Sequence, residues 1–156
     1  MSESSINRRM FLAGAGAVSA SLVNHAGAQI THVDTSKSGP ALKSSTVKLA
    51  GLPAEGDSPG AKAYVQFNGP TKQLAAVAAG ACTLEPGARP HPPHTHPEEE
   101  LMWIGSGTGE MVVNGVTSQV KAGDCMYAEA NVLHGIVNTG KTPMVFYFTK
   151  FLARGA

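Results

Sequence analysis

Two histidines one residue apart are the clearest chemical feature of the sequence. His94 and His96 begin the segment His-Thr-His-Pro-Glu-Glu-Glu, residues 94–100. In a β-strand, residues two apart project from the same face with Cα atoms about 6.5 Å apart. Both imidazoles can then reach one ion, at about 2.1 Å from each nitrogen for a metal such as zinc. A carboxylate a few residues later can join them, so the segment predicts part of a metal site.

A further ligand has to come from elsewhere in the chain. His134 lies in a strong strand context, Val-Leu-His-Gly-Ile-Val-Asn at residues 132–138, and is the natural partner across a barrel. Three neutral imidazoles and one carboxylate suit one divalent transition metal: Mn, Fe, Co, Ni, Cu or Zn. On a six-coordinate ion these ligands leave two positions open, whereas tetrahedral zinc would have none. The same residues can therefore form a catalytic site or a closed one.

Short strands must position these residues. Alternating or continuous apolar runs bounded by turn formers predict strands at residues 46–52, 63–67, 74–84, 101–104, 110–113, 116–120, 125–128, 132–138 and 144–152. Asn114-Gly115 is a strong hairpin signal because a type I′ turn needs positive φ at both central residues. No convincing amphipathic helix is present. A closed barrel or jelly roll is the economical fold because it hides the strand edges.

The pattern as a whole resembles the cupin superfamily. The first cupin motif, G-x5-H-x-H-x3,4-E-x6-G, is matched by His94, His96, Glu100 and Gly107, and the second, G-x5-P-x-G-x2-H-x3-N, by Gly123, His134 and Asn138. The resemblance covers about residues 60–152. It implies an all-β double-stranded β-helix, or jelly-roll barrel, with His94, His96, Glu100 and His134 as metal ligands.

The match departs from the motifs in the loops. Six residues, not five, separate Gly87 from His94, and Glu129 and Asn131 stand at the proline and glycine positions of the second motif. These are turn positions, so we expect a reshaped loop beside the site and no loss of metal.

Strand parity sorts the neighbours of the site. If the ligands point inward, so do Met102 and Ile104, while Leu101 and Trp103 point outward, where cupins often form homodimers. Met102 and Tyr127 are the predicted substrate contacts, and Tyr64, Gln66 and Tyr147 are further polar candidates for the pocket. Arg89 and Arg154 are not obviously on inward strand positions, which disfavours a dicarboxylate such as oxalate as the substrate.

Several residues receive a structural interpretation. Glu98 and Glu99 are expected to be solvated loop charges, and His91 is expected near the barrel mouth. Cys82 and Cys125 are interpreted as two small buried hydrophobes. A disulfide between them and a cysteine ligand to the metal are the open alternatives.

The amino terminus resembles a bacterial export signal. Arg8-Arg9 followed by Phe11-Leu12 is similar to a twin-arginine motif, and the apolar stretch behind it, about 13 residues, is too short to span a bilayer. Small residues at Ala26-Gly27-Ala28 predict cleavage near Ala28. We therefore expect residues 1–28 to be a signal peptide that engages the twin-arginine translocase and directs the protein to the periplasm or outside the cell. Residues 29–60 are expected to be a leader with a first strand and flexible loops, followed by a cupin barrel at 61–154.

Composition bounds the function. The chain has 156 residues, a formal charge of +1, and 15% charged residues with no Lys/Arg run. This excludes a nucleic-acid surface, and no stretch is apolar enough for a stable membrane span. A metal-dependent enzyme acting on a small organic molecule is the leading hypothesis, with oxygenase, lyase or isomerase chemistry open. The alternative is a non-catalytic cupin that binds a small molecule or sugar, or holds a metal ion.

Overall fold

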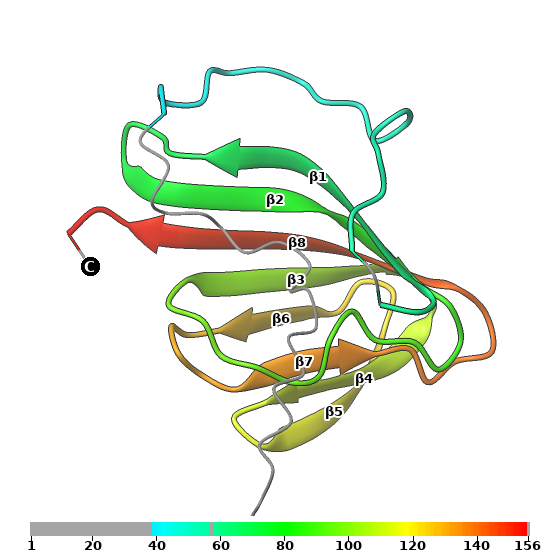
Figure 1. Cartoon of the computed structure of the whole chain (residues 1–156). Helices are drawn as coiled ribbons and strands as arrows, with labels where there is room; N and C mark the ends of the chain where they lie inside the picture. Colours follow the sequence, from blue (N-terminus) through cyan, green and yellow to red (C-terminus); the bar gives the residue numbers. More distant parts are fainter. Residues whose placement is uncertain (1–38, 57, 156) are drawn as a thin grey trace, which may run out of the picture.

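Two antiparallel β-sheets face each other (Figure 1). The computed structural model describes residues 39–56 and 58–155, so Arg8, Arg9 and Ala28 of the predicted export signal lie outside the described residues. The strands are β1 (Ala61–Gly69), β2 (Leu74–Leu84), β3 (Glu99–Ser106), β4 (Thr108–Val113), β5 (Val116–Lys121), β6 (Cys125–Ala128), β7 (His134–Val137) and β8 (Met144–Ala153). One sheet has the order β1-β2-β8-β3-β6 and the other β5-β4-β7. The predicted all-β jelly-roll class is confirmed.

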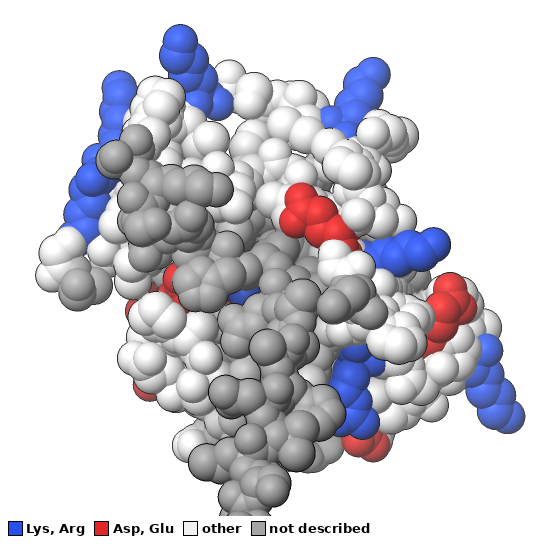
Figure 2. Space-filling model, in the orientation of Figure 1, with Lys and Arg blue, Asp and Glu red and all other residues white. Residues whose placement is uncertain are grey.

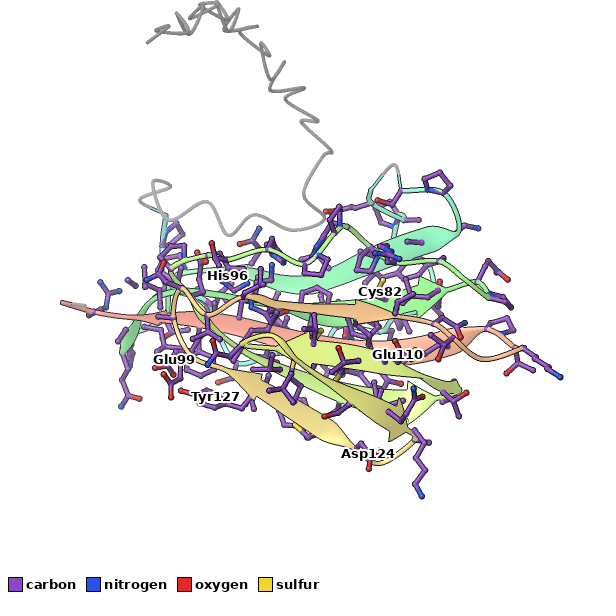
Figure 3. The ribbon with its side chains drawn as sticks, turned by 90° about the horizontal axis from the view of Figure 1, so that it is seen from below. Cys82, His96, Glu99, Glu110, Asp124 and Tyr127 are labelled. Atoms are coloured by element: carbon purple, nitrogen blue, oxygen red, sulfur yellow. The ribbon has the colours of Figure 1, made fainter. Side chains whose placement is uncertain are left out.

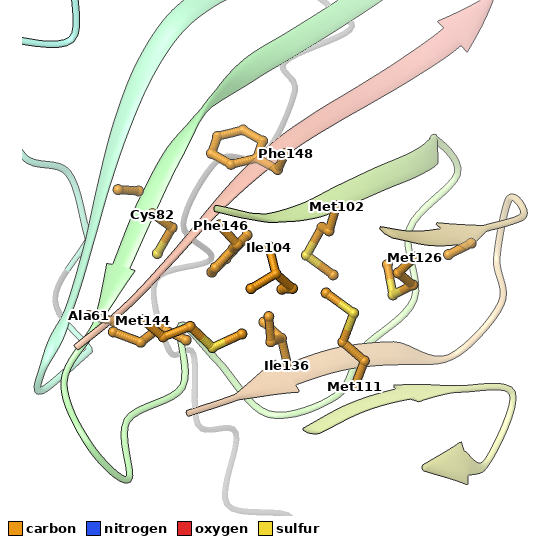
Figure 4. Packing of buried hydrophobic residues seen from close by; sticks show 13 residues of the cluster. Ala61, Cys82, Met102, Ile104, Met111, Met126, Ile136, Met144, Phe146 and Phe148 are labelled. Atoms are coloured by element: carbon orange, nitrogen blue, oxygen red, sulfur yellow. The ribbon is translucent and has the colours of Figure 1, made fainter. Parts of the chain in front are cut away.

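Alternation along the strands places an apolar core between the sheets. On β8, Met144, Phe146 and Phe148 are buried at every second position, as period-two side-chain alternation requires. They pack with Met102 from β3 and with residues of the opposite sheet, as Figure 4 shows. The same alternation carries the inner residues of β3 and β8 toward the predicted metal ligands.

The predicted hairpin is present between β4 and β5. Asn114 and Gly115 have φ values of 49° and 78°, and Val113 pairs directly with Val116. Both central residues adopt the left-handed conformation that a type I′ turn needs, which asparagine and glycine tolerate best.

The prediction of a strand at residues 46–52 is wrong. These residues are mostly exposed, and the backbone turns at this point, with the amide of Leu52 donating to the carbonyl of Leu49 at 3.2 Å. The carbonyl of Val47 accepts a hydrogen bond from the side-chain amide of Gln66 at 2.8 Å in place of a strand partner. An alternating pattern without a neighbouring strand does not form a sheet.

The two cysteines differ in burial, contrary to the prediction that both are buried. Cys82 on β2 points into the core, whereas Cys125 on β6 is exposed. Met126 and Ala128 occupy the inward positions of β6, so parity turns Cys125 outward. Both are free thiols.

The described surface carries neither a basic patch on the visible face nor a membrane helix. Lysine and arginine side chains are scattered, mostly around the margin of the face shown in Figure 2, with acidic side chains between several of them. Within residues 39–56 and 58–155, no helix is long and apolar enough to cross a membrane.

Candidate metal centre

Backbone pairing joins the two histidine segments. The amide of His94 donates to the carbonyl of His134, and the amide of His134 donates to the carbonyl of His94, each at 3.0 Å. β7 already pairs with β4 along its other edge, so His94 forms an isolated bridge on the free side of β7. The two imidazole centroids consequently lie 4.9 Å apart.

Three of the predicted ligands, His94, His96 and His134, converge between the sheets. Nε2 of His96 lies 3.1 Å from Oε2 of Glu100, and Nε2 of His134 lies 2.9 Å from the same oxygen. One potential ligand atom from each of His94, His96 and His134 lies within 4.8 Å of the other two. The Glu100 carboxylate is not in that group but contacts two of its members, so the candidate donors are three clustered imidazoles and one adjacent carboxylate.

The outer nitrogens of two rings are already engaged. Nδ1 of His96 lies 3.0 Å from the carbonyl of Glu98, and Nδ1 of His134 lies 2.8 Å from the carbonyl of Val132. A carbonyl can only accept, so each Nδ1 carries the proton and Nε2 faces the centre. Nδ1 of His94 is buried and has no hydrogen-bond partner among the described residues.

These distances fit a bound ion. Two ligand atoms at about 2.1 Å from one ion and at right angles to each other are about 3.0 Å apart, close to the 2.9 Å and 3.1 Å observed. The Nδ1–H tautomer of His96 and His134 leaves the Nε2 lone pair for a metal once the inner proton is lost. The residues therefore fit a divalent transition metal.

The electrostatic environment favours the protonation states in which Glu100 and His94 can bind a metal. Burial opposes ionisation of Glu100, but hydrogen bonds from His134 and His96 and the charge of Lys150 outweigh it and hold the pKa at about 2. Burial, together with the neighbouring positive charges, lowers the pKa of His94 to about 3. Near neutral pH the site therefore holds a carboxylate and a neutral His94.

Lys150 is a site residue that sequence reasoning missed. It is only 6% exposed and lies directly opposite Glu100 in the β3–β8 pairing. Parity was the available signal, because Lys150 follows Met144, Phe146 and Phe148 at two-residue spacing on the inner face of β8. The lysine brings a positive charge to the wall of the site, where neither Arg89 nor Arg154 is found.

The prediction that Glu98 is a solvated charge is wrong. Its side chain is 3% exposed, and Oε2 lies 3.2 Å from Nδ1 of His96. The chain after Pro97 carries this carboxylate back against the ring of His96, so it cannot reach solvent. Glu99 behaves differently: it is half-buried, and its carboxylate accepts a hydrogen bond from Tyr127.

Of the two predicted substrate contacts, the structure places one beside the metal ligands and the other on the outer surface. Met102 is buried and lines a small cavity of about 20 Å³ beside the ligands. Tyr127 is 49% exposed on the outer face of the five-stranded sheet, next to Glu99 (Figure 3). Met126 and Ala128 take the inward positions of β6, so Tyr127 is not brought to the cluster. Of the other polar candidates, Tyr147 is likewise 45% exposed.

The cavity has mostly apolar walls and an imidazole at its side. Besides His94, Glu100, His134 and Lys150, its lining includes Met102, Ile136, Phe146 and Phe148. The ring of His91 also lines it and stands edge-on to His94, with centroids 3.9 Å apart. Its volume is enough for about one water molecule, so a larger molecule would meet the site from the mouth.

Two asparagines of the second motif have structural roles. Asn131, at the position of the motif glycine, has φ of 62°, and its amide donates to the carbonyl of His96 at 2.8 Å. Asparagine thus supplies the left-handed conformation that glycine would, and the loop contacts the site. Asn138 is fully buried, and its side-chain amide donates to the carbonyls of Leu84 and Thr142 at 2.8 Å and 2.9 Å.

Residues 80–150 match the family model described as "Cupin domain". The fold is a cupin fold. A crystal structure of an RmlC-like cupin from Shewanella frigidimarina is 23% identical, with a TM-score of 0.58 over 72% of this chain and 95% of that one. The family match covers residues 80–150 alone, and the structural likeness is one of fold.

Two further structures show the same fold at lower identity. A predicted oxalate decarboxylase from Thermotoga maritima is 21% identical, with a TM-score of 0.58 over 69% of this chain and 99% of that one. The polyketide cyclase RemF from Streptomyces resistomycificus is 17% identical, with a TM-score of 0.58 over 73% and 83% of the respective chains. Comparison with curated proteins gives no match.

Proposed function

We propose that this cupin is a metal-dependent enzyme that acts on a small organic molecule. The observation that carries the proposal is the convergence of His94, His96 and His134 within 4.8 Å, with Glu100 in contact with two of them. The cluster borders a cavity with apolar walls, which is the usual setting for a small-molecule site. Oxygenase, lyase and isomerase chemistry are all compatible with it.

Some residues of the site would bind the ion, and others form the apolar wall around it. His94, His96, Glu100 and His134 would hold one divalent transition metal, for which Mn, Fe, Co, Ni, Cu and Zn are all candidates. When bound, such an ion supplies Lewis-acid or oxygen-activating chemistry. Met102, Phe146 and Phe148 keep the wall dry, and a low-dielectric wall strengthens every charge interaction at the site.

A non-catalytic role is the second candidate. The cavity volume of about 20 Å³ favours it, because little beyond a water-sized molecule fits inside without movement of the walls. A metal-holding or small-molecule-binding cupin would keep its ion and bind a ligand at the mouth without turning it over.

Metal analysis of purified variants tests the site. Wild-type protein from its native compartment should contain about one metal ion per chain, and His94→Ala and His134→Ala should each lose it. His91→Ala is the matched control, because His91 lines the cavity but is outside the three-histidine group. Unchanged metal content in both ligand variants would refute the assignment.

A screen of the metal-loaded protein separates catalysis from binding. Small organic molecules are tested for oxygen consumption and for product formation, with the metal-free protein as control. Turnover that requires the metal supports the enzyme. Stoichiometric ligand binding without turnover across the screen supports the non-catalytic candidate.

We also propose that the protein is exported by the twin-arginine translocase and acts in the periplasm or outside the cell. The support is the Arg8-Arg9 motif, the short apolar stretch and the small residues at Ala26–Ala28 in the sequence. Replacing Arg8 and Arg9 together by lysine should retain the protein in the cytoplasm. Continued accumulation of the processed protein outside the cytoplasm would contradict the proposal.

A homodimer through the outer face of the five-stranded sheet is part of the same proposal. Trp103, Tyr127 and Tyr147 are 41%, 49% and 45% exposed on this face. Trp103 pairs across strands with Tyr147, so the aromatic rings form neighbouring parts of one surface. Exposed aromatic groups of this kind are enriched in protein interfaces.

A further inference from the structure

His96 lies between two carboxylates. On its inner side, Nε2 is 3.1 Å from Oε2 of Glu100, one of the proposed metal ligands. On its outer side, Nδ1 is 3.2 Å from Oε2 of Glu98 and 3.0 Å from the carbonyl of the same residue. The ring is therefore held from behind by a charged group and a backbone dipole that can both only accept hydrogen bonds.

The other two histidines of the cluster lack this arrangement. Nδ1 of His134 lies 2.8 Å from the carbonyl of Val132, a neutral acceptor. Nδ1 of His94 is buried and finds no hydrogen-bond partner in residues 39–56 and 58–155. Within that part of the chain, a carboxylate supports the outer nitrogen of His96 alone among the three.

Glu98 occupies a costly position for a carboxylate. Its side chain is 3% exposed, and Oε1 is buried without a hydrogen-bond partner among the described residues. Burying an ionised carboxylate costs free energy unless a hydrogen bond or an opposite charge compensates it. The contact that compensates Glu98 is the one to His96, because Nδ1 of that ring has a proton to donate.

We propose that Glu98 is a positioning residue of the metal centre. Its backbone carbonyl accepts the Nδ1–H of His96 at 3.0 Å, and its carboxylate lies 3.2 Å from the same nitrogen. Together they fix the tautomer and the ring orientation, and the carboxylate charge makes Nε2 a stronger donor toward the ion. Carboxylates behind metal-bound histidines act in this way in other metalloproteins. The inference rests on the proposed metal site and adds a residue that the cupin motifs do not contain.

The adjacent acidic residues provide a matched comparison. Glu98 and Glu99 carry the same charge one position apart, but Glu99 contacts Tyr127 on the outer face, whereas Glu98 contacts His96. Replacing either by glutamine keeps the size and removes one negative charge. Only Glu98→Gln removes the charge that supports the ring.

The experiment measures metal affinity in place of activity. Wild type, Glu98→Gln and Glu99→Gln are titrated with Zn²⁺ against a competing chelator, and their Cu²⁺ forms are compared by electron paramagnetic resonance. Glu98→Gln should bind Zn²⁺ about 10–100-fold more weakly and give an altered copper spectrum. Glu99→Gln should stay within about twofold of wild type, with an unchanged spectrum.

The outcomes separate the two proposals. If wild type binds no metal, the proposed function fails and the inference falls with it. If wild type binds metal and Glu98→Gln matches it, or if both glutamine variants lose affinity equally, the role of Glu98 is refuted while the metal site stands.

A measurement on the unmodified protein covers the case in which Glu98→Gln does not fold. In the zinc form of wild type, nuclear magnetic resonance should show a downfield Nδ1 proton on His96 that exchanges slowly with solvent. An Nδ1 proton that exchanges as fast as that of an exposed histidine would contradict the proposed hydrogen bond.

Discussion

The carboxylate oxygen Oε2 of Glu100 lies 2.9 Å from Nε2 of His134, although 34 positions separate the two residues. Glu100 belongs to β3 in the five-stranded sheet and His134 to β7 in the three-stranded sheet, so the contact spans the two sheets. Nδ1 of His134 already donates to the carbonyl of Val132. A metal ion at Nε2 must therefore displace the proton that joins these two side chains.

This displacement predicts that metal binding weakens as the pH falls. Burial lowers the pKa of His134, but hydrogen bonds to Glu100 and Val132 outweigh it, and the net pKa is raised above the ordinary 6.5. Below that pKa His134 is protonated and must lose a proton to bind. With pKa values of about 2 and about 3, Glu100 and His94 do not titrate between pH 5 and 8.

The expected contribution of His134 is about a tenfold loss of affinity per pH unit below its pKa. Zn²⁺ titration calorimetry between pH 5 and 8, repeated in buffers of different ionisation enthalpy, measures both the affinity and the protons released. A pH-independent affinity with no proton release would contradict the prediction.

The cysteines should differ sharply in reactivity. Burial raises the pKa of the Cys82 thiol to about 12, and its side chain is 1% exposed. Cys125 is exposed. At pH 8 an alkylating reagent should label one thiol in the native protein and two after unfolding without reductant, because the thiolate is the reactive form. The Cys125→Ser variant should show no labelling in the native state. After unfolding it should show one labelled thiol, which would identify Cys82 as the protected cysteine.

Gly107 and Gly87 allow backbone strain to be separated from steric overlap. Their φ values are nearly equal, at +82° and +80°, but a Cβ on Gly107 would lie 2.8 Å from Cα of Met144, whereas one on Gly87 meets nothing within 4 Å. Gly87→Ala should lower the free energy of unfolding by about 1–2 kcal/mol. Gly107→Ala should cost about 1–3 kcal/mol more, because Met144 has to move. Urea unfolding measures both, and equal losses would contradict the steric explanation.

The proposed dimer through Trp103, Tyr127 and Tyr147 can be tested by a single substitution. Trp103→Glu should convert a dimer to a monomer in sedimentation velocity, because it places a charge among Tyr127 and Tyr147. Val116→Glu is the control: Val116 is 67% exposed but belongs to β5 in the other sheet. A monomeric wild type at about 100 μM, or equal effects of the two variants, would argue against this interface.

Sequence spacing predicts where the strands lie better than it predicts which segments they pack against. The strands predicted at residues 74–84 and 125–128 have the bounds of β2 and β6, because turn formers mark both ends. Residues 46–52 show the same alternation but pair with no strand among the described residues. The sequence alone does not show that this neighbouring strand is missing. Tyr127 and Cys125 were misplaced for a related reason: the pattern of β6 shows two faces without showing which one meets the opposite sheet.

The candidate site could be predicted as far as spacing within a segment allows. His94, His96 and Glu100 are recognisable from their offsets, and His134 from its strand context. Lys150 and Glu98 were missed because their environments come from other segments. The burial of Lys150 depends on its place opposite Glu100, and that of Glu98 on the turn after Pro97. Both are charged residues, which composition alone assigns to the surface.

The backbone hydrogen bonds around the site have a consequence for how the protein matures. His94 pairs with His134, and Asn131 holds His96, through main-chain groups that require no ion. We therefore expect these main-chain contacts to hold the histidines close together whether or not an ion is bound. A preformed cage of this kind pays little ordering entropy on binding. If the protein is exported in the folded state, as proposed, its metal would be chosen in the compartment in which folding is completed.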